Sequence, residues 1–208
     1  MDHIDLSVIV PVYNLEQWIT PLIKSLKAQE LDGYTMEVIF VLNNCTDRSE
    51  DVIRGSGIDC TIINCEKQGA GAARNAGYDI ASGDYVWFMD GDDWLMTSNA
   101  IHDAVDMAKR HGVNVLRIPF QSDGFGGMWY GMVWQYVFKR EFIADLRFPE
   151  WEAWRPGEDN VFVDLVFAKA GYSRIRATRM RHTEEALYFY NYPREGSIMH
   201  AFHGGKNK

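Results

Sequence analysis

Apolar runs of strand length alternate with helical patterns along the first 120 residues. The run LSVIVPVY (6–13) is almost wholly apolar, and further runs follow at 37–42, 60–64, 85–89 and 115–120. Short continuous apolar runs are typical of strands that are buried on both faces. The segments between them place apolar residues three or four positions apart, which is typical of helices. Strands that alternate with helices predict an α/β fold with a mainly parallel sheet.

Glycines and small polar residues mark the expected helix ends. Small residues fill 70–82, and Gly83 follows as a natural position for positive φ at the end of that helix. Thr97 or Ser98 can cap a helix that ends at Gly112. The final third is less regular, and there we expect a strand around 133–139, a helix near 158–170, and strands near 172–180 and 186–192.

Length, composition and charge favour one intracellular domain. The chain has 208 residues, of which 47% are hydrophobic, so it can bury a core of useful size. The formal net charge of −8 and pI near 5.2 argue against nucleic acid as a partner, because nucleic-acid binding depends on clustered Lys and Arg. Three cysteines suit a reducing compartment. The first residues resemble neither a signal sequence nor a transmembrane segment, so we expect a cytoplasmic protein.

The stretch FMDGDDW (88–94) places the carboxylates of Asp90, Asp92 and Asp93 directly after an apolar strand. In open α/β sheets, ligands bind beyond the carboxyl ends of the strands. The residues expected in the same crevice follow the first two strands: Tyr13, Asn14, Asn43 and Asn44. Two carboxylates separated by a glycine can bind one Mg²⁺ or Mn²⁺ together with substrate phosphates. On these residues alone, an ordinary strand-ending turn explains the stretch equally well.

Four motifs occur in an order that resembles family-2 glycosyltransferases of the GT-A fold: SVIVPVYN, GAGAARNAG, GDYVWFMDGDDWL and GEDNVF. The resemblance covers roughly residues 5–198 and implies one Rossmann-like catalytic domain over 1–198. Residues 1–120 would bind the nucleotide sugar, 121–198 would bind the acceptor, and 199–208 would form a disordered tail. The implied reaction moves a sugar, with inversion, from a nucleotide-diphosphate donor to a saccharide or lipid-linked acceptor. A UDP-sugar is the favoured donor, and Mn²⁺ or Mg²⁺ is the implied cofactor.

The resemblance assigns donor contacts to residues that follow the strands or lie in the quoted motifs: Pro11, Tyr13, Asn14, Asn43, Arg74, Asp90, Asp92 and Arg194. Tyr13 would stack on the base, although packing at a strand end explains it as well. Asn43 stands where the family usually has an aspartate, which leaves the base open because an amide both donates and accepts hydrogen bonds. Arg74 would pair with the diphosphate or with neighbouring carboxylates, and its alternative is a solvated helix residue. A dinucleotide-binding interpretation of GAGAARNAG fails, since the segment follows the third strand.

Glu158 and Asp159 open the helix expected near 158–170. Carboxylates in a first turn are favoured by the helix dipole, so capping is the preferred interpretation on the residues alone. The resemblance instead makes Asp159 the base that takes the proton of the acceptor hydroxyl, with Glu158 contacting the acceptor.

The other implied roles concern the metal and the acceptor. Asp90 and Asp92 would bind the metal, and His182 could complete its shell, although a lone His is more often a packing or surface residue. Trp134, Trp154 and Asp93 would contact the acceptor, because aromatic faces pack against sugars. Glycines at 124, 126, 127 and 131 suggest a lid. A lipid-linked acceptor would be met by peripheral association with a membrane.

Two other classes of function remain open. A nucleotidyltransferase would share the sheet and the carboxylates, but it should show a Gly-rich basic loop after the first strand, where this chain has PVYNLEQ. A non-catalytic carbohydrate-binding relative would have no need of a base, so the combination of Asp90, Asp92 and Asp159 argues against it.

Overall fold

The computed structural model describes residues 3–122, 131–151, 157–171 and 186–191. Their main sheet has six strands in the order β3-β2-β1-β4-β8-β6. Three parallel pairings join β1 (Leu6–Val12), β2 (Met36–Leu42), β3 (Thr61–Asn64) and β4 (Tyr85–Phe88). The remaining strands, β8 (Tyr136–Lys139) and β6 (Val115–Arg117), pair antiparallel. The expected α/β fold with a mainly parallel sheet is therefore confirmed.

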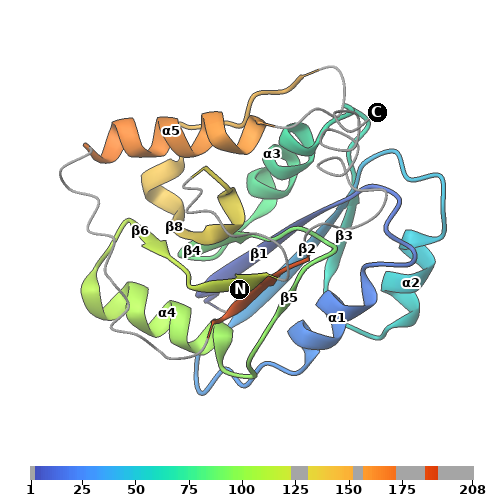
Figure 1. Ribbon diagram of the computed structural model, residues 1–208, viewed down its shortest axis with the longest axis horizontal. Coiled ribbons are helices and arrows are strands. Elements are labelled where there is room, and N and C mark those ends of the chain that lie inside the picture. Colours follow the sequence, from blue (N-terminus) through green and yellow to red (C-terminus); the bar gives the residue numbers. More distant parts are fainter. Residues whose placement is uncertain (1–2, 123–130, 152–156, 172–185, 192–208) are drawn as a thin grey trace.

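Helices cover both faces of this sheet (Figure 1). One face carries α3 (Ala70–Ile80) and α5 (Glu158–Ala170), and the other carries α1 (Thr20–Lys27), α2 (Ser49–Gly55) and α4 (Ala100–His111). Alternate side chains of β1 serve the two cores: Val8 and Val10 pack with α1 and α4, while Ile9 packs with α3. Both faces of the strand are buried, which explains why its sequence is continuously apolar.

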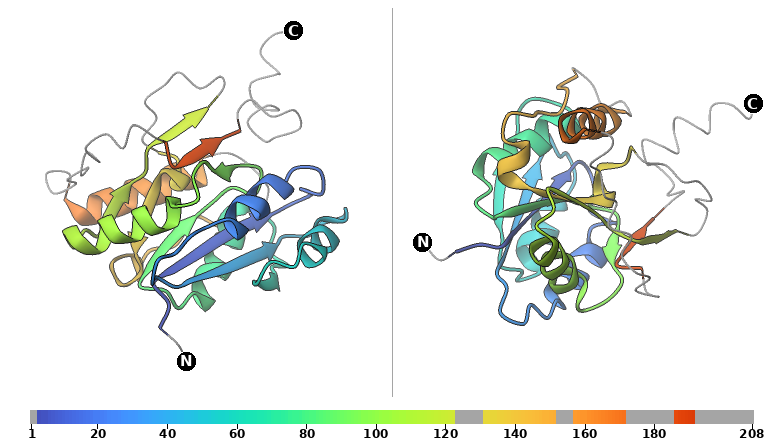
Figure 2. Two further views of the ribbon diagram at one scale, coloured as in Figure 1. Left: turned by 90° about the horizontal axis from the view of Figure 1, so that it is seen from below. Right: turned by 90° about the vertical axis from the view of Figure 1, so that its left-hand side faces the viewer.

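A second sheet of three short strands lies beyond the main one, in the order β5-β9-β7 (Figure 2). It joins β5 (Trp94–Leu95), β9 (Tyr188–Tyr190) and β7 (Phe120–Ser122). The apolar run 115–120 is thus two strands of different sheets rather than one, because Pro119 lacks the N–H that a continuous ladder needs. The expected strand at 133–139 begins as a 3₁₀ turn over Val133–Gln135.

Three expectations about helix ends have different outcomes. The helix α4 ends at Gly112, as predicted, and Gly112 has φ +57. Asn99, rather than Thr97 or Ser98, precedes that helix, and it makes no capping side-chain bond. Gly83 does not have positive φ; glycine is needed there because a Cβ atom would lie 2.6 Å from the Ser7 backbone nitrogen.

Candidate functional site

The acidic turn over residues 90–93 follows β4 at the edge of the sheet where β1 and β2 also end. Parallel pairing brings these carboxyl ends together, as the sequence predicts. The turn packs closely at Gly91, where a Cβ atom would lie 2.5 Å from Leu15 Cδ1 and would force that side chain to shift. The side chains of Asp90 and Asp92 are partly exposed, so both carboxylates can be reached from solvent.

Arg74 ties this turn to α5. Its Nη2 donates to Asp90 Oδ1 at 2.9 Å, and its Nη1 donates to Glu158 Oε1 at 2.6 Å. The Arg74 side chain is only 5% exposed, and its guanidinium carbon lies 5.4 Å from the centroid of the Phe148 ring. Burial by itself would lower the pKa of Arg74, but the nearby carboxylates of Asp90 and Glu158 outweigh it and raise the pKa. Arg74 is therefore a buried cation that holds two carboxylates, which excludes the solvated alternative.

Asp159 lies beside Glu158 at the start of α5. Burial and the charges of Glu158 and Asp90 raise the pKa of Asp159 to about 7, against a smaller lowering by Arg74. A carboxylate that titrates near neutral pH has the proton affinity expected of a general base. Its Oδ1 accepts the Asn160 N–H at 2.9 Å, whereas Glu158 bonds to Arg74 and not to the helix backbone. Capping alone therefore does not account for the pair.

Asn75 is a site residue that the sequence reasoning missed. Its Nδ2 donates to the Phe148 carbonyl at 3.0 Å, and its Oδ1 accepts the Phe148 N–H at 2.9 Å. The start of α3 packs closely against the same segment. At Gly71 there is no room for a side chain, since a Cβ atom would lie 2.2 Å from the Pro149 carbonyl oxygen. Asn75 thereby fixes the helix that carries Arg74. The sequence signal that could have identified Asn75 is the adjacent polar pair Arg74-Asn75 within a helix otherwise rich in small residues.

Two asparagines at the ends of β1 and β2 have left-handed backbones, Asn14 with φ 51 and Asn44 with φ 59. Asn14 joins the two loops, since its Oδ1 accepts the Thr46 N–H at 2.8 Å. Such conformations are uncommon outside glycine and often occur at functional sites. Of the other expected donor contacts here, Tyr13 is half-buried and Pro11 is buried within β1.

Asn43 is fully buried, and its side chain is used by the protein itself. Its Nδ2 donates to the Cys65 and Lys67 carbonyls at 2.9 and 2.7 Å, and its Oδ1 accepts the Gly69 N–H at 2.8 Å. The donor-base contact expected of Asn43 does not fit this arrangement. Next to it, a pocket of about 270 Å³ opens between the ends of β2 and β3, and Asn44, Asn64 and Glu66 are among its lining residues.

Two residues expected at the acceptor lie in the interior instead. Trp134 is 1% exposed and stacks against both Tyr188 and Tyr190, with ring centroids 5.0 and 4.8 Å away. Asp93 is also 1% exposed; its Oδ2 accepts the Tyr188 hydroxyl at 2.6 Å and its Oδ1 accepts the Asn191 N–H at 2.9 Å. Burial, then the charges of Asp92 and Asp90, raise the pKa of Asp93 well above its ordinary value. Neither side chain presents a surface to a sugar, so we correct both assignments.

The other expected contacts, Trp154, His182 and Arg194, lie outside the described residues, as do the glycines at 124, 126 and 127. Gly131 is described, and it packs so closely on Asn160 that a Cβ atom would lie 2.5 Å from Asn160 Oδ1.

The exposed carboxylates of the acidic turn fit a divalent metal. Asp90 uses Oδ1 for Arg74, and within the described part of the chain its Oδ2 has no protein partner. Carboxylate oxygens that are open to solvent are the ligands preferred by Mg²⁺ and Mn²⁺, which also take oxygens from phosphates. Asp90 and Asp92 therefore remain the residues that could hold such an ion.

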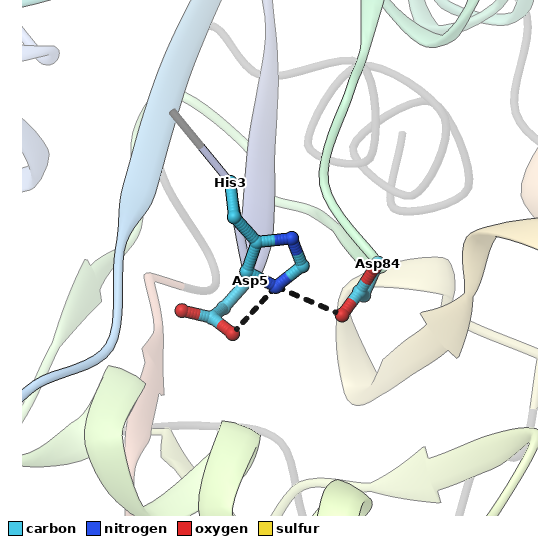
Figure 3. A group of neighbouring side chains, drawn as sticks. All are labelled: His3, Asp5 and Asp84. Atoms are coloured by element: carbon cyan, nitrogen blue, oxygen red, sulfur yellow. Dashed lines mark ion pairs between the residues drawn. The ribbon is translucent and has the colours of Figure 1, made fainter. Parts of the chain in front are cut away.

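A second possible metal group lies at the opposite edge of the sheet, where His3 Nε2 is 3.2 Å from both Asp5 Oδ1 and Asp84 Oδ2 (Figure 3). It is the one set of three potential ligands brought within 4.8 Å among the residues that the structure describes. Lys109 already forms ion pairs with Asp5 and Asp84. A metal would have to displace this ammonium, so we do not interpret the group as a metal centre.

Comparisons with known proteins agree with this geometry. Residues 7–184 match the sequence profile described as "Glycosyl transferase family 2". The chain is 28% identical over 219 aligned residues to the uncharacterized glycosyltransferase EpsJ of Bacillus subtilis, covering 88% of this chain and 60% of EpsJ. It is 24% identical to the poly(ribitol-phosphate) β-N-acetylglucosaminyltransferase TarS of Staphylococcus aureus, covering 93% of this chain and 36% of TarS. The chain thus spans less than two thirds of these relatives.

Solved structures show the same fold. TarS residues 1–349 in complex with UDP-GlcNAc superimpose with a TM-score of 0.78 at 23% identity, covering 94% of this chain and 60% of that one. Glucosyl-3-phosphoglycerate synthase of Mycobacterium tuberculosis, solved with Mn²⁺, uridine diphosphate and phosphoglyceric acid, gives 0.62 at 18% identity, covering 80% and 65%. In the part of the chain that is described here, no helix is both long and apolar enough to cross a bilayer.

Proposed function

Because the chain belongs to glycosyl transferase family 2, we propose that it transfers a sugar, with inversion, from a nucleotide-diphosphate donor to an acceptor hydroxyl. One observation carries this proposal: buried Arg74 joins Asp90 on the acidic turn to Glu158, which adjoins the candidate base Asp159. The network sets the donor-side and base-side carboxylates relative to each other. Such fixed positions are what a displacement reaction needs.

Asp90 and Asp92 would hold Mn²⁺ or Mg²⁺ together with the diphosphate. The ion, when bound, would act as a Lewis acid that stabilises the charge developing on the departing nucleoside diphosphate. Support comes from the partial exposure of Asp90 and Asp92 on the turn and from the Mn²⁺ present in the mycobacterial structure. Arg74 would orient the Asp90 carboxylate through Oδ1, which would leave Asp90 Oδ2 for the ion.

Asp159 would act as the base. As the acceptor oxygen attacks the anomeric carbon, its proton passes to the Asp159 carboxylate, and the bond from the anomeric carbon to the diphosphate oxygen breaks. The attack comes from the face opposite the leaving group, so the anomeric configuration inverts. Glu158 would stay paired with Arg74, and its charge is one cause of the raised pKa of Asp159.

We further propose that the donor is a UDP-sugar and the acceptor a saccharide or a lipid-linked sugar. The fold match to TarS in complex with UDP-GlcNAc supports the nucleotide. A lipid-linked acceptor would bring the protein to the surface of a membrane.

The test is a screen of nucleotide sugars for Mn²⁺-dependent binding, hydrolysis and transfer, followed by Asp159→Asn with the active donor. Loss of a general base should lower kcat by about 10²- to 10⁴-fold while donor binding persists. Asp164→Asn is the matched control, because Asp164 is exposed on the same helix. Unchanged turnover in Asp159→Asn would reject this base, and wild-type binding without hydrolysis or transfer would favour a non-catalytic relative.

A further inference from the structure

Asp93 is the member of the acidic turn that the proposed reaction does not use. Its carboxylate is buried next to Asp92, and no sugar or metal can reach it without displacing the two groups that bond to it. Burying a carboxylate near two others is costly, and an apolar residue would fill the same place without that cost. The position of Asp93 therefore needs an explanation beyond packing.

The Tyr188 hydroxyl connects Asp93 to Asp90, at the other end of the turn. It donates to Asp93 Oδ2 at 2.6 Å and accepts the Asp90 backbone N–H at 3.2 Å. Tyr188 itself is fully buried, with its ring stacked on Trp134. The hydroxyl is thus held in place by its ring and bonds to both ends of the acidic turn.

Asn191 completes the arrangement from the other side. Its backbone N–H donates to Asp93 Oδ1 at 2.9 Å, and its side-chain Nδ2 donates to the Asp92 carbonyl at 3.1 Å. The three aspartates of the turn, Asp90, Asp92 and Asp93, are therefore each bonded to β9 or to the residue after it, nearly one hundred positions later in the chain. These bonds fix the backbone of the turn while leaving the Asp90 and Asp92 side chains partly exposed.

We propose that Asp93, Tyr188 and Asn191 form a positioning latch that sets the Asp90 and Asp92 carboxylates for the divalent metal and the diphosphate. The inference rests on the proposed function, because it concerns the same metal and donor. It assigns Asp93 no contact with the acceptor, and it attributes the fixed geometry of the turn to Tyr188 of β9 and to Asn191, the residue after that strand. Groups that orient metal ligands from behind typically contribute about 10- to 100-fold in metal affinity or activity.

The test compares Tyr188→Phe with Tyr190→Phe. Both rings stack on Trp134, but within the described residues only the Tyr188 hydroxyl bonds to Asp90 and Asp93. Calorimetry would measure the Kd of Mn²⁺ in the presence of UDP, and thermal unfolding would be followed in the absence of both. We expect Tyr188→Phe to raise the Mn²⁺ Kd by about tenfold or more and Tyr190→Phe to change it by less than about twofold.

Asn191→Ala is the second variant, and it decides the matter should Tyr188→Phe fail to fold. It removes the bond to the Asp92 carbonyl and leaves the buried ring stack intact, so a smaller rise in the Mn²⁺ Kd is expected. An unchanged Kd in folded Tyr188→Phe and in Asn191→Ala would overturn the latch, as would an equal rise in Tyr190→Phe. If the wild-type protein binds neither Mn²⁺ nor UDP, the proposed function fails before the latch is tested.

Discussion

The main sheet carries one ionic cluster where its parallel strands begin, which we call the amino edge, and another where they end, which we call the carboxyl edge. The two clusters are built differently. At the amino edge, Lys109 pairs with Asp5 and Asp84, and His3 lies between the same carboxylates. At the carboxyl edge, Arg74 contacts Asp90 and Glu158, while further carboxylates lie on the same turn and at the same helix end. Charge is nearly balanced at the first edge and strongly negative at the second.

That difference indicates which edge has a function. A balanced cluster stabilises the fold and needs nothing more. An excess of carboxylates is tolerated when a cation joins them or when one of them takes a proton, and Asp159 has the raised pKa that the second case requires. Structural ion-pair networks also shift pKa values, so substitutions in each cluster are needed to show which one serves the reaction.

The largest effect is expected from Arg74→Met. Removing one partner of a buried ion pair leaves uncompensated charge and costs about 3–5 kcal/mol of unfolding free energy. Both Asp90 and Glu158 would lose their partner, so transfer should fall with stability. Urea denaturation measures the first quantity and a donor-hydrolysis assay the second. Arg74→Lys keeps the charge but not the planar fork, and it should lie between wild type and Arg74→Met.

Asp159 gives the next effect, through pH. Its pKa of about 7 means that the base is increasingly protonated below neutral pH. The kcat/KM should therefore fall by about tenfold per pH unit on the acidic side of that value. Stability should move the opposite way: since the folded pKa is raised above the unfolded one, the contribution of Asp159 is greatest at low pH and is lost as pH rises through about 7. A flat kcat/KM profile from pH 5 to 8 would contradict the assignment.

The sequence predicts those features that depend on local pattern. Apolar runs identify β1, β2 and β4, and parallel order then brings Asn14 and Asp90 to one edge. The α5 boundaries at Glu158 and Ala170 agree with the expected helix. These predictions succeed because burial on both faces leaves a signal in every residue of a strand.

The remaining features depend on partners that are distant in the sequence. The contact between Arg74 and Glu158 spans 84 positions, and that between Asp93 and Tyr188 spans 95. The sequence allows Trp134 to be either a sugar contact or a core residue, because aromatic residues are common in both settings. Only its stacking against Tyr188 and Tyr190 shows that it belongs to the core. Asn43 was similarly ambiguous, because nothing local shows that its amide bonds to the Lys67 carbonyl.

The smallest effect is expected at the amino edge, from Lys109→Met. Burial alone would raise the pKa of Asp5, but bonds from Lys109 and Thr35 outweigh it and lower the pKa. Thr35 donates to Asp5 through both its N–H and its hydroxyl, so the carboxylate keeps partners after Lys109 is removed. We expect a loss of about 1 kcal/mol in unfolding free energy and no change in transfer.

The same substitution has a signature in acid. A lowered folded pKa gives stability that is present above the unfolded pKa of Asp5 and lost as pH falls through the folded value. Without the Lys109 ammonium, the pKa of Asp5 in the folded protein rises. As the pH is lowered, urea denaturation should therefore show that the unfolding free energy of Lys109→Met begins to fall at a higher pH than that of the wild type. Lost transfer in a variant that is still folded at assay pH would mean that the amino edge also serves the reaction, and the contrast between the two edges would no longer hold.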